Sequence, residues 1–149
     1  MLVGSVSFAL DIPLAWESLT RKSDRIARGS VRNLSCKAGT NEFGDQLIYT
    51  DVYIGVTDAL KGDRSDFVLT IEGGTLDDVT LTVSDAPVFK IGEEVIVFAI
   101  KDSLTYRPVA GTFSKYTISE GNRVREADMD YNTFKNGIIH TTRGKEEHK

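Results

Sequence analysis

The chain has 149 residues, of which 40% are hydrophobic and 27% charged, a composition typical of one globular domain with a core of its own. Cys36 is the only cysteine, so an intrachain disulfide and a metal site built from several cysteines are excluded. The net charge is −4, and residues 39–118 contain thirteen acidic and six basic residues. This acidic excess is unfavourable for binding the phosphates of nucleic acid.

The N-terminal residues predict a signal remnant followed by a helix. Residues 1–9, MLVGSVSFA, are uncharged, and Ser7 and Ala9 are small residues at the spacing of a signal-peptide cleavage site. The alternative is a hydrophobic arm that packs on the domain. Residues 10–24 then change to a helical period and predict a short amphipathic helix, with Trp16 as a core anchor.

The central part of the chain is organised around residues 47–62, LIYTDVYIGVTDALKG, in which β-branched residues alternate with polar and aromatic ones. A period of two predicts a strand, and its length predicts a bend. A first strand is expected over 25–37, with a bulge near Gly29. Further strands are expected over residues 66–72, 76–83, 95–100 and 112–118.

The links between these strands are expected to be turns and loops. We predict a polar loop over 38–46, a turn or bulge at Gly73-Gly74, a connector over 103–107 and a bend over 108–111. The run of apolar residues in 95–100 indicates burial on both faces of that strand.

These elements predict a mainly β fold, a small antiparallel OB-like barrel of five to six strands with one short N-terminal helix; a β-sandwich is the alternative. The barrel domain is expected over 10–118. Residues 119–149 form a polar C-terminal extension, partly disordered, in which Asn136-Gly137 predicts the turn of a hairpin over 122–142.

Three stretches carry a resemblance that covers Ser23 to about Ile118. They are SDRIARGSV, IYTDVYIGVTDALKGD and IEGGTLDDVTLTVSDAPVFKIGEEVIVFAI. Their order and spacing resemble an uncharacterised family of small exported bacterial and archaeal proteins. The resemblance implies a fold and an exported location and no particular reaction. Ala27 and Arg28 depart from the family pattern, and the C-terminal extension has no counterpart in it.

The candidate functional residues are Tyr49, Asp51 and Tyr53, which share one face of the central strand. An aspartate between two tyrosines is unusual in a strand, and paired tyrosines are typical of faces on which bases stack. His140 and His148 lie in or beside the polar tail, so no catalytic group, metal site or cofactor is predicted.

Two hypotheses of function follow. The preferred one is a non-catalytic binding module outside the cytoplasm, with a protein or peptide partner and no membrane span in the mature chain. The alternative is a single-stranded nucleic-acid-binding protein of the OB type, which the acidic charge of the predicted barrel disfavours.

Overall fold

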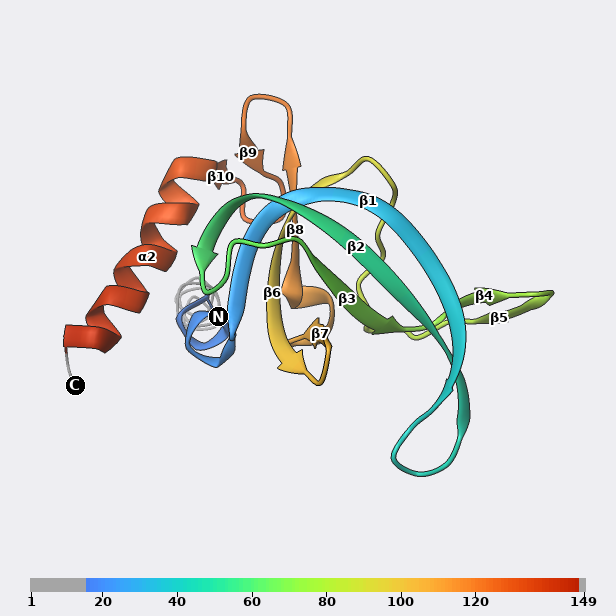
Figure 1. Ribbon diagram of the computed structural model, residues 1–149. Helices are drawn as coiled ribbons and strands as arrows, with labels where there is room; N and C mark the ends of the chain where they lie inside the picture. Colours follow the sequence, from blue (N-terminus) through green and yellow to red (C-terminus); the bar gives the residue numbers. More distant parts are fainter. Residues whose placement is uncertain (1–15, 148–149) are drawn as a thin grey trace, which may run out of the picture.

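The computed structural model describes residues 16–147, so the predicted signal remnant over 1–9 lies outside the described residues. Residues 16–22 are helical and the rest is mainly β (Figure 1). The elements in chain order are β1 (Arg25–Thr40), β2 (Gln46–Lys61), β3 (Phe67–Glu72), β4 (Gly74–Leu76), β5 (Val79–Leu81), β6 (Glu94–Asp102), β7 (Thr105–Pro108), the 3-10 helix η1 (Gly111–Ser114), β8 (Lys115–Ser119), β9 (Arg123–Val124), β10 (Met129–Asp130) and α2 (Tyr131–Glu147).

Five strands form a sheet that closes on itself. Pairing runs from β1 to β2, β3, β7 and β6, and β6 pairs again with β1. All of these pairings are antiparallel except β3–β7, a parallel contact with the single residue pair Leu69 and Tyr106. β8 extends the sheet by pairing with Val95 to Val97 of β6, beyond the part of β6 that β7 covers. The seam between β3 and β7 is therefore the least paired joint of the closing sheet.

β1 and β2 are long because each bends across the molecule (Figure 1). The register between them shifts at three places in the first half of β1, and one shift lies between Arg28 and Gly29, as the predicted bulge requires. A Cβ at Gly29 would lie 2.4 Å from the carbonyl oxygen of Gly55, so the two strands approach too closely for any side chain there.

Two hydrophobic clusters share β6. Val95, Val97 and Ala99 point into the interior of the closing sheet, where they meet side chains such as Val52 and Leu69. The alternate residues Ile96 and Phe98 point outward into a second cluster. All of these residues are buried, so the predicted burial of this strand on both faces is confirmed.

The second cluster lies under the helical residues 16–22 and α2. Phe134 of α2 is 3% exposed and its ring lies 5.3 Å from that of Trp16 and 5.1 Å from that of Tyr116. Trp16 Nε1 donates a hydrogen bond of 3.1 Å to the Tyr116 hydroxyl. The prediction that Trp16 anchors a short helix on the core is confirmed, because its ring packs against this cluster.

The structure corrects the prediction for residues 73–83. The chain does turn at Gly73-Gly74, where both glycines have positive φ. The expected barrel strand over 76–83 is wrong, however, because this stretch folds into the separate two-stranded hairpin β4–β5, with Asp77 and Asp78 at its tip. Among the described strands, β4 and β5 pair only with each other and join no strand of the larger sheet.

Two further predictions are corrected between β6 and the C-terminus. The expected connector over 103–107 contains β7, and the expected strand over 112–118 begins only at Lys115, after η1. A C-terminal hairpin exists as β9–β10, but Asn136-Gly137 lies within α2 and forms no turn. Tyr131, Phe134 and Ile138 explain the helix, since this spacing puts all three on the face buried in the second cluster.

Candidate functional site

The outer face of β1, β2 and β3 carries the three residues singled out from the sequence. Val52 and Ile54 of β2 point into the core, so Tyr49, Asp51 and Tyr53 point away from it. Cys36 lies on the neighbouring strand as a half-buried free thiol, with its sulfur 3.4 Å from Thr50 Oγ1.

Asp51 joins three strands through both of its oxygens. Lys37 Nζ of β1 lies 3.0 Å from Asp51 Oδ2, and Thr70 Oγ1 of β3 donates a hydrogen bond of 2.7 Å to Asp51 Oδ1. The Asp51 side chain is 14% exposed. Because both oxygens already have partners, Asp51 links β1, β2 and β3 across this face.

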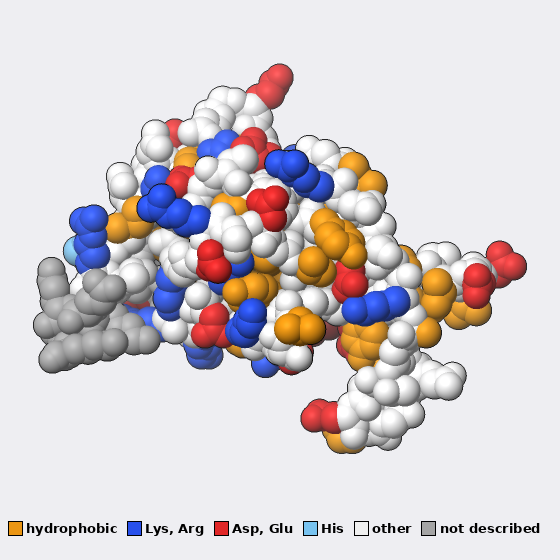
Figure 2. Space-filling model, viewed as in Figure 1, with side chains coloured by type: hydrophobic (Ala, Val, Ile, Leu, Met, Phe, Trp, Pro, Cys, Tyr) orange, Lys and Arg blue, Asp and Glu red, His pale blue; other side chains and the backbone are white. Residues whose placement is uncertain are grey.

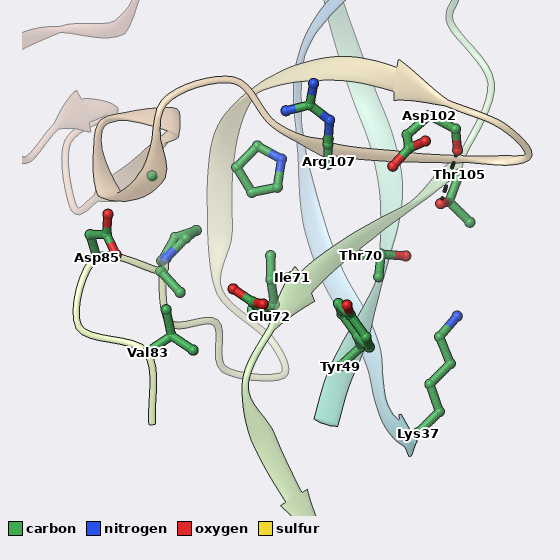
Figure 3. A pocket seen from close by; sticks show the side chains of 14 residues that line it. Lys37, Tyr49, Thr70, Ile71, Glu72, Val83, Asp85, Asp102, Thr105 and Arg107 are labelled. Carbon is green, nitrogen blue, oxygen red and sulfur yellow. Dashed lines mark hydrogen bonds between the residues drawn. The ribbon is translucent and has the colours of Figure 1, made fainter. Parts of the chain in front are cut away.

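A cleft of about 390 Å³ opens beside these residues, where β3 and β7 separate beyond their single pair. We call it the seam cleft. Figure 3 shows its walls: Tyr49, Thr70 and Glu72 from β2 and β3, and Arg107 from β7 on the opposite side. The segment over 83–87 crosses one end, where Asp85 lines the cleft, and Asp102 lines it near the turn between β6 and β7.

The charges in the seam cleft are mixed. Lys37 and Arg107 are basic, whereas Glu72, Asp85 and Asp102 are acidic. Hydroxyl groups of Tyr49, Thr70 and Thr105 add donors and acceptors, and Ile71 and Pro108 add apolar surface. Such a lining suits a ligand that carries groups of both charges together with hydrogen-bond donors and acceptors.

The structure separates the predicted site residues. Tyr49 lines the seam cleft, Asp51 lies beside it under Lys37, and Tyr53 lies outside it with 39% of its surface exposed. Sequence reasoning did not single out Glu72 or Arg107. They belong to strands that meet only at the seam, and no local pattern reveals that contact.

A second polar cluster lies far from the seam cleft and attaches α2 to the sheet. The Arg28 guanidinium packs 4.3 Å from the centre of the Tyr131 ring and donates a hydrogen bond of 2.7 Å to Glu94. The Tyr131 hydroxyl donates a hydrogen bond of 2.6 Å to Asp58 Oδ2, and Lys135 Nζ lies 2.8 Å from the same oxygen. The cluster therefore fixes the first turns of α2 against β1 and β2.

The pKa values in this cluster reflect these contacts. Burial raises the pKa of Asp58, but the hydrogen bonds from Lys135 and Tyr131 lower it by more, so the net pKa lies below its ordinary value. Burial and the hydrogen bond to the Asp58 carboxylate both raise the pKa of Tyr131. The lowered pKa of Asp58 and the raised pKa of Tyr131 both favour an ionised Asp58 paired with a neutral Tyr131.

Comparison with models of known protein families and with curated proteins finds no match for the chain. Within residues 16–147, no three histidine, cysteine, aspartate or glutamate side chains are grouped as a metal site would require. Over the same residues, no helix has both the length and the apolar character needed to cross a bilayer.

Proposed function

We propose that the protein is a non-catalytic binding module that works outside the cytoplasm and holds a segment of a protein or peptide partner in the seam cleft. The observation that carries this proposal is the mixed lining of the cleft. A peptide segment presents amide donors, carbonyl acceptors and side chains of both charges, and the cleft offers Lys37 and Arg107 opposite Glu72 and Asp85.

The fold that we propose for this module is an OB-like barrel. The order of pairing around the closing sheet, with one parallel contact between the third strand and the strand after β6, supports it over a sandwich, in which two separate sheets pack face to face. OB barrels use the face of their second and third strands for ligands. In this chain that face is β2–β3, which forms one wall of the seam cleft.

A binding role agrees with the groups that line the seam cleft. The described residues that line it include no histidine, cysteine or serine. Its carboxylates come from separate elements, β3, the segment over 83–87 and β6. These carboxylates, with the hydroxyl groups and cations beside them, are groups that recognise a ligand by hydrogen bonds and charge.

The proposed location rests on the uncharged residues 1–9 and on the resemblance to exported proteins. Fractionation of the source cells followed by intact mass of the protein tests it. We expect a chain that lacks its first residues and is recovered outside the cytoplasm. An unprocessed chain in the cytosol would remove this part of the proposal.

The binding role is tested by selecting ligands from a displayed library of random peptides. Selected peptides are expected to lose about tenfold in affinity when Arg107→Glu reverses one charge of the cleft, since a favourable contact becomes a repulsive one. Arg64→Glu, an exposed position in the loop before β3, is the matched control. Failure to select any peptide, or equal losses in the two variants, would contradict a peptide site in the cleft.

Single-stranded nucleic acid is the second candidate, because Tyr49 and Tyr53 share the outer face of β2, where bases can stack. This function requires oligonucleotide binding that weakens with salt and with Tyr53→Ala. The acidic residues around Tyr49 disfavour it, and absence of binding of a labelled oligothymidine at low salt would eliminate it.

A further inference from the structure

Two hairpins project from the same side of the molecule and enclose a second hollow. One is the far half of β1–β2 with its connecting loop, and the other is β4–β5 (Figure 1). The groove between them measures about 620 Å³ and is lined by residues 38–40, 46–48 and 76–81 except Asp78. We call it the hairpin groove, and it shares no lining residue with the seam cleft.

The walls of the hairpin groove are apolar and accessible. Leu47 and Ile48 line it from β2, and Leu76, Val79 and Leu81 line it from the opposite hairpin. Val79 is 62% exposed. Figure 2 shows hydrophobic side chains along the β4–β5 arm. Leu47, Ile48, Leu76 and Leu81 are half-buried. Accessible apolar side chains around a hollow are typical of a surface that a partner covers.

The charge at the ends of both arms is acidic. The loop over 41–45 and the turn over 77–78 contain four acidic residues and no lysine or arginine: Glu42, Asp45, Asp77 and Asp78. Lys37, at the base of the first arm, lies 3.0 Å from Asp51 Oδ2, which offsets its charge. Acidic side chains lie at the ends of both arms (Figure 2). This field attracts a cationic partner and repels anionic lipid headgroups and nucleic acid.

The backbone of β1 beside the groove is open to a further strand. β6 pairs with β1 only from Arg25 to Ser30, and the sole described strand partner of residues 33–40 is β2. Residues 38–40 lie on this open edge and also line the groove. An extended segment laid along it can pair with the edge while its side chains enter the hollow.

We propose that the hairpin groove is a second binding site, which takes an extended segment of a partner protein with alternating apolar and Lys or Arg residues. The apolar walls supply burial, the acidic arms select the charge, and the open edge of β1 selects the extended conformation. The site does not depend on the seam cleft for any of its residues.

The test uses a labelled peptide, Lys-Val-Thr-Val-Lys-Val-Thr-Val-Lys, and the same peptide with Glu in place of Lys. We expect the basic peptide to bind at low salt, to bind less as salt rises to about 0.3 M, and to protect the amides of residues 38–40 from hydrogen exchange. The acidic peptide is expected not to bind.

Variants separate this site from the rest of the surface. D77N/D78N is expected to weaken the basic peptide about fivefold, the loss for two exposed charge pairs. The control E120Q/D128N removes the same charge at the β9–β10 end and is expected to leave affinity unchanged. Glu72→Gln changes a residue of the seam cleft and is also expected to leave the affinity for the basic peptide unchanged. Binding in the hairpin groove can therefore be established even if the proposal for the seam cleft fails.

Three results would overturn the inference: no binding of the basic peptide, equal binding of the acidic peptide, or equal loss in the two double variants. A fourth result would mean that the hairpin groove binds a second copy of this chain in place of a partner protein. If the protein forms dimers that D77N/D78N dissociates, the groove binds a second copy of this chain, and sedimentation of the protein without peptide distinguishes that case.

Discussion

Replacing Phe134 with alanine is expected to destabilise the whole molecule. Phe134 is 3% exposed and packs against Trp16, Phe98 and Tyr116 in the second cluster. Truncation of a buried phenylalanine costs about 3–5 kcal/mol, and the three remaining rings can close only part of the cavity. We expect a loss of about 3–4 kcal/mol in the free energy of unfolding. With a urea dependence of about 2 kcal/mol per M, the unfolding midpoint falls by about 1.5–2 M.

The assay is urea unfolding followed by far-ultraviolet circular dichroism and by fluorescence of Trp16, the only tryptophan. Because β6 belongs to both clusters, the two signals are expected to change together in the wild type. Phe113→Ala is the matched control: Phe113 is 68% exposed, and its loss is expected to cost less than about 0.5 kcal/mol. Equal midpoints for the two variants would refute the docking of α2 on the sheet.

Three further predictions concern single contacts. The pKa of Asp58 is lowered in the folded state, so its contribution to stability is present above its ordinary pKa of 3.8 and is lost as pH falls through the lower folded value. The urea midpoint of Asp58→Asn should therefore lie below that of the wild type at pH 7, by about 1 kcal/mol in free energy, and converge with it in acid. Gly29→Ala is expected to cost about 2–3 kcal/mol in the free energy of unfolding, because its Cβ meets the backbone of Gly55. The three atoms nearest to a Cβ at Gly55 belong to the guanidinium end of the exposed Arg32, which can turn away, so Gly55→Ala should cost less than about 1 kcal/mol. Thermal unfolding of the two variants checks this order. Asp77 has a φ of 54°, so Asp77→Gly is expected to stabilise the protein by about 0.5–1 kcal/mol, and an unchanged or lower melting temperature would contradict this.

The strands with clear alternation could be predicted from the sequence. β1, β2, β3 and β6 begin and end within a few residues of their predicted bounds. In β1, β2 and β3 the alternation records a buried face, whereas in β6 a continuous apolar run records burial on both faces. The four residues of β7 end in proline and have no such pattern. They form a strand because β6 pairs with them over four positions, which is a long-range effect.

The C-terminal helix shows the opposite error. Asn136-Gly137 is a strong local turn pattern, and it led to the prediction of a hairpin. In α2 this dipeptide lies between Phe134 and Ile138, and burial of those two side chains in the second cluster outweighs the low helix propensity of glycine. The cluster joins parts of the chain that are more than a hundred residues apart, so no local window contains the information.

The candidate site was predictable only in its β2 part. Tyr49 stands out because an aromatic residue on the outer face of a long strand has a visible pattern. Glu72 and Arg107 come together only because β3 and β7 meet, and no pairing rule in the sequence specifies that parallel contact. The sequence of one strand therefore predicts which of its residues share a face. It does not predict which residues of another strand form the opposite wall of the cleft.

The single pair of residues at the seam has a mechanical consequence. Leu69 and Tyr106 are the only paired positions between β3 and β7, whereas β1 and β6 pair at six positions on the other side of the sheet. A lateral motion that separates β3 from β7 thus has a ready hinge along β1–β6 and breaks few backbone contacts. The seam cleft lies on the moving side, so its width can adapt to ligands of different thickness, and the second cluster stays closed because none of its residues belongs to β3 or β7. The limit on this motion is the contact of Phe67 with Tyr106, which joins the first cluster across the seam.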